Sequence, residues 1–255
     1  QVNVHSGKII GVEALLRWRH DGVVVSPARF IPILEASREI VEVGQWIIDE
    51  SCRQLSLWKK AGHDIEVSIN LSAVQFSDER LLTTIEQAMS KYEVQPDRVD
   101  FEITESLLVD DVEEAIERLT EIKSLGASIS IDDFGTGYSS LAYLQQFPID
   151  RLKIDRAFVK DYPGTDDGVI ATSIVALAKA LGLKSLAEGV EDQEQLDLMK
   201  SLDCDEYQGY FFSRPIPGDE ILDLLNDKQE RRTHPAPTCE FGTSGKQRLA
   251  EVPVS

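Results

Sequence analysis

The stretch Ser128-Ile129-Ser130-Ile131-Asp132-Asp133-Phe134-Gly135 is the most informative part of this chain of 255 residues. Serine and isoleucine alternate over its first four positions, which is the pattern of a strand with one apolar and one polar face. Two adjacent carboxylates follow, and Gly135 and Gly137 then open a flexible loop. A strand that ends in paired acids beside a mobile loop predicts a divalent-metal site that the loop controls.

Strand-like and helix-like stretches alternate along most of the chain. Short strands are predicted at Val12–Trp18, Ile65–Leu71, Val99–Glu105, Ser128–Phe134, Arg151–Phe158, Lys184–Val190 and Glu206–Phe212. Helices are predicted at Gln45–Ala61, Leu81–Tyr92, Val112–Leu125, Ser139–Phe147, Val169–Leu181, Gln193–Leu202 and Asp219–Leu225. The apolar residues of Val169–Leu181 form a helical stripe, so we expect that helix to face the core.

Seven strand–helix units of this kind predict parallel strands joined by right-handed crossovers. An eighth strand is expected from Val2–Val4 together with residues upstream of the sequence. Eight units suggest a closed α/β barrel whose active face lies at the carboxyl ends of the strands. An open, doubly wound sheet is the alternative architecture. No GxGxxG segment follows the first strand, which argues against a dinucleotide-binding fold.

Charge and composition limit the possible partners. The formal net charge is −19; residues 228–255 carry +2 and residues 1–227 carry −21, so we expect no binding of long nucleic acid. Residues 1–227 are predicted to form the barrel, and the polar segment from Lys228 to Ser255 a flexible tail. Three scattered cysteines indicate a reduced, cytoplasmic domain. Without an apolar run of 18 residues or a signal peptide, we expect no membrane contact from this segment. The missing initial Met suggests a piece of a longer protein.

Strand parity predicts that polar side chains from several strands meet. Ser68 pairs with Asn70 on one strand face, and Ser130 pairs with Asp132 on another. Polar residues inside a barrel are costly unless they are paired, so these faces describe one shared polar site. Its expected members are Glu13, Asn70, Glu102, Asp132, Asp133, Lys153 and Glu188.

Five carboxylates crowded together repel one another unless cations are present. Hard oxygen ligands of this kind favour Mg²⁺, Mn²⁺ or Ca²⁺ over zinc. Two metal ions bridged by one aspartate would suit the in-line attack of water on a phosphodiester. Lys153 would orient that water or stabilise the charge on the phosphate. Because Ca²⁺ accepts a looser coordination geometry, we expect it to inhibit.

Over about residues 1–218 the chain resembles the EAL domain family, the cyclic di-GMP phosphodiesterases. Seven segments carry the likeness, in order and with family-like spacing. They are Glu13-Ala14-Leu15-Leu16-Arg17-Trp18, Asn70-Leu71-Ser72, Glu102-Ile103-Thr104-Glu105-Ser106, Asp132–Leu141, Leu152-Lys153-Ile154-Asp155-Arg156, Ala187-Glu188-Gly189-Val190-Glu191 and Gln208-Gly209-Tyr210.

The resemblance implies a TIM-like (β/α)8 barrel with an atypical first strand, here partly missing. It also implies hydrolysis of cyclic di-GMP to linear pGpG with two Mg²⁺ or Mn²⁺ ions. By position, Glu13, Asn70, Glu102 and Asp132 resemble the ligands of the first metal, and Asp132 and Asp133 those of the second. Glu188 resembles a general base or a further metal ligand, and the choice stays open. Lys153 resembles the lysine that orients the water.

The same resemblance assigns the remaining site residues. Arg17 matches a phosphate-binding arginine and Gln208 a site residue of the last strand, while Leu15 and Asp155 join the substrate contacts. Glu105 matches the acid that holds the Asp132–Leu141 loop. A homodimer is implied, as is fusion to sensor or GGDEF domains in the full protein. Asp192 stands where threonine is commoner in the family; aspartate is also a good helix N-cap, so we expect little effect.

Two other functions stay open at this point. A non-catalytic cyclic di-GMP receptor is one, although degenerate members typically lose acids that this chain retains. A metal-dependent barrel enzyme acting on a different phosphodiester is the other.

Overall fold

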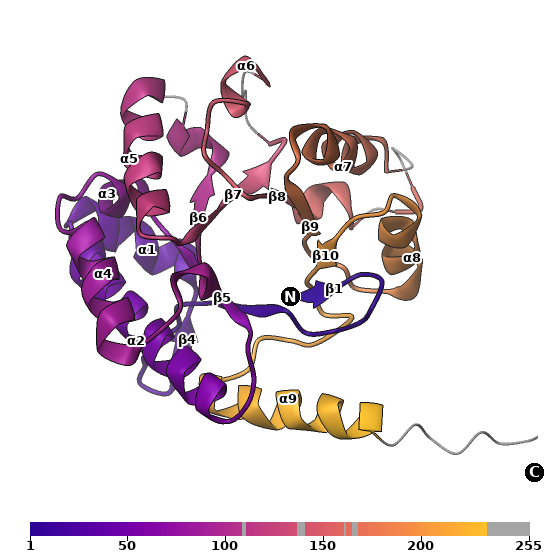
Figure 1. Ribbon diagram of the computed structural model, residues 1–255, viewed down its shortest axis with the longest axis horizontal. Helices are drawn as coiled ribbons and strands as arrows, with labels where there is room; N and C mark the ends of the chain where they lie inside the picture. The colour runs from indigo at the N-terminus through magenta and orange to yellow at the C-terminus, as the bar shows by residue number, and fades with distance from the viewer. Residues whose placement is uncertain (109–110, 137–140, 161, 165–167, 234–255) are drawn as a thin grey trace, which may run out of the picture.

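Eight strands form one curved sheet that winds round into a barrel (Figure 1). The computed structural model describes residues 1–108, 111–136, 141–160, 162–164 and 168–233. Along the sheet the strands are β1 (Val2–Asn3), β10 (Glu206–Tyr207), β9 (Lys184–Ala187), β8 (Arg151–Ile154), β7 (Ser128–Phe134), β6 (Val99–Thr104), β5 (Glu66–Asn70) and β2 (Gly11–Ala14).

Neighbouring strands are parallel except for β1, which runs antiparallel to β10 with Val2 opposite Tyr207. The two ends of the sheet meet near β1, because Ile10 N donates to Gln1 O at 3.0 Å and Val2 pairs with Ile9. The nearly closed barrel and its atypical first strand confirm the predicted fold. The open, doubly wound alternative is therefore wrong.

Helices surround the barrel (Figure 1). They are α1 (Pro27–Ala36), α2 (Ile40–Lys60), α3 (Ala73–Phe76), α4 (Leu81–Tyr92), α5 (Val112–Ser124), α6 (Leu141–Leu144), α7 (Val169–Leu181), α8 (Gln193–Ser201) and α9 (Gly218–Thr233), with single 3₁₀ turns η1 (Pro96–Arg98), η2 (Glu105–Leu108) and η3 (Arg156–Phe158). Helix α2 buries Ile48, Cys52 and Leu55 at spacings of three and four residues, which places them on one face. The Asp192 side chain accepts from Gln195 N at 2.9 Å and caps α8, as expected.

The predicted strand Val12–Trp18 is wrong in its second half. Strand β2 ends at Ala14, and Trp18–His20 is β3, which pairs with β4 (Val23–Val25) in a separate hairpin. Asp21 and Gly22 make its two-residue turn with φ of 48° and 79°, the conformation that Asp-Gly favours. That Asp-Gly pair is visible in the sequence and could have predicted the hairpin.

Two predicted helix boundaries need correction, and one helix was not predicted. Helix α2 begins at Ile40 rather than Gln45, and α1 had not been predicted. Helix α9 runs through Lys228 to Thr233, so it extends beyond the proposed start of the tail; the tail's residues 234–255 lie outside the described part, and its flexibility stays a prediction. On α7 the buried face is Ala171, Ile174, Val175 and Ala178.

Val169 and Ile170, the first residues of the predicted α7 stripe, are exposed. The buried part of the helix therefore begins at Ala171. Within the described ranges, no helix has the length and apolar character needed to cross a lipid bilayer.

Alternation along the strands separates an apolar outside from a polar inside. On β7, Ile129 and Ile131 pack in the core while Ser130 and Asp132 belong to the barrel interior. On β8, Leu152 and Ile154 are core residues, and the fully buried Lys153 points inward. The alternation predicted from the sequence therefore corresponds to polar side chains inside the barrel, where the candidate site lies.

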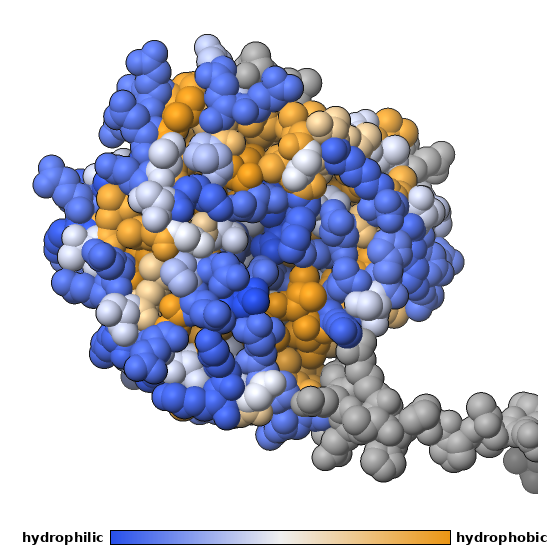
Figure 2. Space-filling view, in the orientation of Figure 1, coloured by the Kyte–Doolittle hydropathy of each residue, from blue (hydrophilic) through white to orange (hydrophobic). Residues whose placement is uncertain are grey.

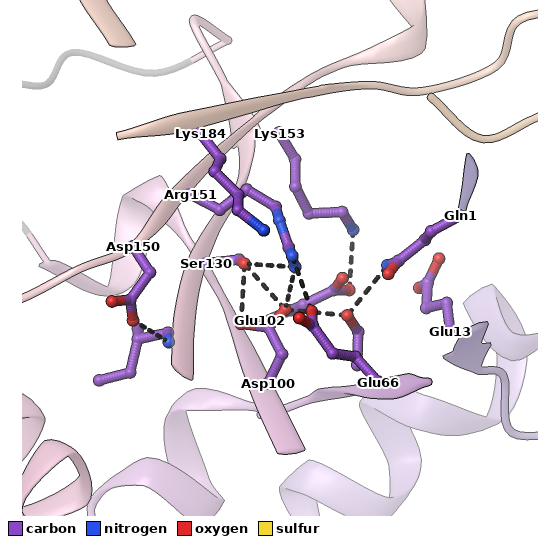
Figure 3. A network of polar contacts seen from close by, with 12 residues as sticks. Gln1, Glu13, Glu66, Asp100, Glu102, Ser130, Asp150, Arg151, Lys153 and Lys184 are labelled. Carbon is purple, nitrogen blue, oxygen red and sulfur yellow. Dashed lines mark hydrogen bonds and ion pairs between the residues drawn. The ribbon is translucent and has the colours of Figure 1, made fainter. Parts of the chain in front are cut away.

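A buried ionic ring lies beneath the candidate site (Figure 3). Arg151 lies 3.0 Å from Asp100, 2.8 Å from Glu66 and 2.8 Å from Glu206. The Asp100 carboxylate also accepts from the Ser130 hydroxyl at 2.8 Å. One arginine thus neutralises part of the charge of three carboxylates on three different strands.

Candidate active site

Lys153 is the centre of a cluster at the carboxyl ends of the strands. Its Nζ lies 2.7 Å from Glu102 Oε2, 2.9 Å from Asp132 Oδ1 and 2.7 Å from Glu188 Oε1. Figure 3 shows the Lys153 side chain reaching down towards Glu102, with Glu13 close by. The ammonium group of Lys153 therefore pairs with acids of β6 and β7 and with Glu188, the residue that follows β9.

Amide side chains join Glu13 to the same cluster. Asn70 Nδ2 donates to Glu13 Oε1 at 2.7 Å, and Gln208 Nε2 donates to Glu13 Oε2 at 2.8 Å. The same Gln208 nitrogen donates to Glu188 Oε1 at 2.8 Å. The structure therefore brings together Glu13, Asn70, Glu102, Asp132, Lys153, Glu188 and Gln208.

Asp132 and Asp133 come to the same side of the sheet because β7 is irregular there. The pairing register with β8 shifts between Ile131 and Phe134, and Asp133 has a φ of +52°. A bulge of this kind changes the direction of a side chain that would otherwise point to the opposite face. One ligand atom from each of Asp132, Asp133 and Glu188 lies within 4.8 Å of the others.

Glu105 anchors the start of the loop that follows these acids. Its Oε2 accepts from Gly135 N at 2.9 Å, and its side chain is buried. This contact gives the predicted loop role a direct geometrical basis. Residues 137–140 of the Asp132–Leu141 loop lie outside the described residues.

Burial and mutual repulsion change the acidity of the cluster. Burial, together with the charges of Asp132 and Glu13, raises the pKa of Glu188 to about 7 even though Lys153 lowers it. Burial also raises the pKa of Glu102 well above its usual value. A carboxylate with a pKa near neutrality is suited to accept a proton during a reaction.

The pKa values of two other carboxylates, Glu13 and Asp133, shift in opposite directions. Burial works to raise the pKa of Glu13, but Lys153 and the donors of Asn70 and Gln208 outweigh it, so this pKa is lowered. Burial and the neighbouring Asp132 and Asp155 raise the pKa of Asp133 to about 6. Glu13 thus stays ionised, whereas Asp133 lies in a more strongly repulsive environment.

The donor set fits divalent cations. Glu102 Oε1 is buried and has no hydrogen-bond partner among the described residues, which is costly unless something else satisfies it. The surrounding groups are carboxylate and amide oxygens, the ligands that Mg²⁺ and Mn²⁺ prefer. Residues that would hold such ions are Glu13, Asn70, Glu102, Asp132, Asp133 and Glu188.

A cavity of about 810 Å³ opens beside the cluster. Glu13, Glu188 and Gln208 line it, and so do the predicted substrate contacts Leu15 and Arg17. The Arg17 side chain is exposed and donates to Leu16 O at 3.0 Å. Asp155 does not line this cavity; its side chain caps η3 and lies near Asp133.

The buried ring of Arg151, Asp100, Glu66 and Glu206 had not been predicted. Three of its members precede site residues by two positions: Asp100 precedes Glu102, Arg151 precedes Lys153 and Glu206 precedes Gln208. Glu66 precedes Ser68, which shares a strand face with Asn70. Alternation places residues two apart on one strand face. Extending the predicted polar faces two residues towards the amino ends of the strands would have found the ring.

The fold and the acidic cluster define a β/α-barrel protein with a candidate metal site at the carboxyl ends of its strands. The chain belongs to the EAL domain family, whose model matches residues 1–215. This result confirms the family that the sequence motifs had indicated.

Two curated relatives and one solved structure are highly similar to the chain. It is 41% identical over 220 residues to the bifunctional diguanylate cyclase/cyclic di-GMP phosphodiesterase MucR of Pseudomonas aeruginosa, covering 85% of this chain and 32% of MucR. It is 40% identical over 214 residues to the cyclic di-GMP phosphodiesterase NbdA of the same organism, covering 83% of this chain and 27% of NbdA.

The solved structure is the MucR phosphodiesterase in complex with c-di-GMP. It superimposes with a TM-score of 0.83 at 41% identity, covering 86% of this chain and 90% of that one. The chain therefore matches most of that phosphodiesterase structure, although it spans only 32% of the length of MucR and 27% of that of NbdA.

Proposed function

We propose that this chain is a metal-dependent phosphodiesterase that hydrolyses cyclic di-GMP to linear pGpG. The observation that carries the proposal is the polar cluster around Lys153, which Glu102, Asp132 and Glu188 contact directly. Glu13 and Asn70 adjoin it, and Asp133 lies beside Asp132 and Glu188. The similarity to MucR and NbdA, which are named for this activity, supports the substrate.

The residues of the cluster divide the chemistry among them. Divalent cations, when bound, would polarise the phosphodiester and make a bound water more acidic. Glu188 would accept the proton of the attacking water, because its carboxylate lines the cavity and is oriented by Lys153 at 2.7 Å and Gln208 at 2.8 Å. Lys153 stays protonated, since the surrounding acids outweigh the effect of burial and raise its pKa.

Lys153 therefore supplies fixed positive charge and three donors within the cluster. It orients Glu188 in the ground state and stabilises the negative charge that develops on the phosphate. Gln208 keeps Glu13 and Glu188 at a fixed separation, because one amide nitrogen donates to both. Glu105 holds Gly135 and so fixes the chain that follows Asp132 and Asp133.

The second candidate is a cyclic di-GMP receptor without turnover. It would bind the nucleotide in the same cavity but release no product. An assay with purified protein, cyclic di-GMP and Mg²⁺ or Mn²⁺, followed by chromatography, distinguishes the two. Formation of pGpG supports the enzyme, and tight binding without product supports the receptor.

The same proposal includes three further points. The chain forms a homodimer, it belongs to a longer signalling protein, and it is located in the cytoplasm. The relatives' greater length supports further domains in the full protein. Sedimentation of the isolated chain tests the dimer: a single monomeric species at assay concentration would contradict it.

A further inference from the structure

The hairpin of β3 and β4 is separate from the barrel sheet. Among the described residues, β4 (Val23–Val25) pairs with β3 (Trp18–His20) and with no other strand. Helix α1 supports one face of the hairpin, because the Trp18 ring meets the Phe30 ring edge-on with centroids 5.8 Å apart. A hairpin of two strands is only marginally stable in water, so a third strand would stabilise this one.

The register of the hairpin determines which main-chain groups of β4 face outward. Its turn has two residues, so His20 and Val23 on either side of the turn form a hydrogen-bonded pair. Such pairs alternate with non-hydrogen-bonded pairs in an antiparallel ladder, so Arg19 and Val24 form a pair of the second kind. The N–H and C=O of Val24 therefore point away from β3, and no other described main-chain group bonds to them.

Side chains distinguish the two edges of the hairpin. Strand β3 carries Arg19 and His20, and charged or polar side chains of this kind discourage further pairing at a strand edge. Strand β4 consists of three valines, which favour the extended conformation and carry no charge. Val23 is 67% exposed and Val24 is 52% exposed, so both faces of β4 are open to water. The edge of β4 is therefore the one suited to accept another strand.

The charge around the hairpin is opposite to that of the whole chain. Hydrophilic residues cover much of the face shown in Figure 2, and acids outnumber Lys and Arg by 45 to 26 in the chain. From Arg17 to Arg29, by contrast, three arginines accompany one acid, Asp21, which lies 3.6 Å from His20. The amino end of α1 follows β4 directly, its Ser26 makes no side-chain cap, and its first turn has no acid. Because helix amino ends and arginines attract negative charge, this region favours an acidic partner.

Three kinds of partner could cover the edge of β4, and the observations favour one of them. A lipid surface would accept the valines, but it offers no hydrogen bonds to the main chain of Val24. A second copy of the chain would bring the same arginines together, and like charges repel. An extended peptide with acidic side chains would satisfy both the main-chain groups and the arginines.

We propose that β4 accepts an acidic, extended segment of a partner protein, which adds to the hairpin as a third strand. Hydrogen bonds to the main chain of Val24 hold the segment, and Arg19 and Arg29 select its acidic side chains. None of the three valines of β4 is among the residues that line the cavity beside Glu188. The surface is therefore separate from the proposed reaction, and the inference does not depend on that reaction.

The probe for this surface is a synthetic peptide of about nine residues in which valine and glutamate alternate. With a fluorescein label, its binding to the intact chain is measured by fluorescence anisotropy. The wild type should bind it saturably with a Kd below about 1 mM. The same peptide with lysine in place of glutamate should bind at least about tenfold more weakly, because its charge matches that of the arginines.

Val24→Pro is the variant that separates strand addition from other modes of binding. Proline removes the outward N–H of residue 24, and β3 does not use that group, so the hairpin should persist. Binding of the glutamate peptide should weaken by at least about tenfold. Val24→Thr is the matched control: it keeps the N–H and a residue suited to strands, so its Kd should stay within about threefold of the wild type.

Amide hydrogen exchange of the wild type gives a second measurement that does not depend on the proline variant. The glutamate peptide should slow the exchange of the Val24 N–H, because the added strand would hydrogen-bond to it. Far-UV circular dichroism and Tm show whether Val24→Pro has kept its fold.

The proposal is overturned if the glutamate peptide does not bind saturably up to about 1 mM. Equal affinity of folded Val24→Pro and Val24→Thr, or unchanged exchange at Val24, would overturn it as well. Two further outcomes would replace it: self-association that Val24→Pro abolishes would assign the edge to a second copy, and binding to phosphatidylserine vesicles in place of the peptide would assign the surface to a membrane.

Discussion

At the residue scale, Glu188 combines three properties that a general base requires. It contacts Lys153 and Gln208, it lines the cavity, and burial raises its pKa to about 7. We predict that Glu188→Gln lowers kcat for cyclic di-GMP by about 10²- to 10⁴-fold, the usual contribution of a positioned base.

The control for Glu188→Gln is Glu191→Gln. Glu191 also lines the cavity and pairs with Arg156 at 2.7 Å, but it lies outside the acidic cluster. It should retain kcat within about tenfold, since its loss removes no proton acceptor. Equal kcat for Glu188→Gln and the wild type would remove Glu188 from the mechanism.

The same pKa shift predicts how stability depends on pH in the absence of metal. The folded protein raises the pKa of Glu188 from 4.5 to about 7, so between these values it binds a proton more tightly than the unfolded chain does. Stability therefore falls as pH rises through this window. We expect the Tm of the EDTA-treated protein to be higher at pH 5.5 than at pH 7.5.

Mg²⁺ and the Glu188→Gln variant provide the checks on this pH dependence. Saturating Mg²⁺ should reduce the slope, because the cations stabilise the ionised acids. Glu188→Gln should reduce it as well, because the titrating group is gone. A slope that is the same in all three samples would show that other groups cause it.

At the element scale, the bulge in β7 and the turn η2 act together. The bulge directs Asp132 and Asp133 to one side, and Glu105 of η2 holds Gly135 three residues after Asp132. We predict that Glu105→Ala lowers kcat/KM by about ten- to a hundredfold and weakens Mg²⁺ binding, because the acids lose their fixed direction.

Glu105→Gln is the matched variant for that prediction. Its amide oxygen can still accept from Gly135 N, so it should retain more activity than Glu105→Ala. Titration with Mn²⁺ measures metal affinity separately from turnover. Unchanged Mn²⁺ affinity in Glu105→Ala would show that the anchor does not organise the metal site.

The ring around Arg151 connects strands far apart in the sequence. Arg151→Met would leave Asp100, Glu66 and Glu206 without their shared cation inside the barrel. Breaking a buried ion pair on one side costs about 3–5 kcal/mol. We therefore expect the free energy of unfolding in urea to fall by about that amount.

Arg53→Met is the comparison for the Arg151 variant. Arg53 pairs with Glu50 at 2.6 Å on the surface of α2, where an exposed pair contributes at most about 1 kcal/mol. Similar losses of stability in the two variants would contradict the structural importance of the buried ring.

Strand parity explains why so much of the site could be predicted from the sequence. The alternation in Ser128–Phe134 and Arg151–Ile154 assigns Asp132 and Lys153 to the same interior, and the structure places them 2.9 Å apart. Two-residue periodicity is a local property, so a single sequence reveals it.

Other features depend on tertiary geometry that local patterns do not contain. The hairpin of β3 and β4 was missed because the apolar run was read as one strand, despite Asp21-Gly22. The cation–π contact between Arg214 and Tyr210, whose ring centroid lies 4.4 Å from the guanidinium carbon, depends on how the chain folds back after Gly209. Asp155 was expected among the substrate contacts, but it lies beside Asp133 and outside the lining of the cavity.

At the scale of the whole molecule, the excess of negative charge indicates that the protein needs bound cations to function. The chain carries a net charge of −19, and five carboxylates meet around Lys153 or beside it. We predict that EDTA abolishes turnover and that Mg²⁺ or Mn²⁺ restores it. Ca²⁺ should inhibit, because its longer bonds and looser geometry position the oxygen ligands differently. Undiminished rates in saturating Ca²⁺ would contradict this assignment.

The most direct test of the central claim is single-turnover hydrolysis of cyclic di-GMP by the purified chain. The wild type and Glu188→Gln would each be mixed in excess over the nucleotide with Mg²⁺, and pGpG followed by chromatography. The account predicts rapid formation of pGpG by the wild type, none after EDTA, and a rate at least about a hundredfold lower for Glu188→Gln. Nucleotide that stays bound and uncleaved by the wild type would contradict it and identify the chain as a receptor.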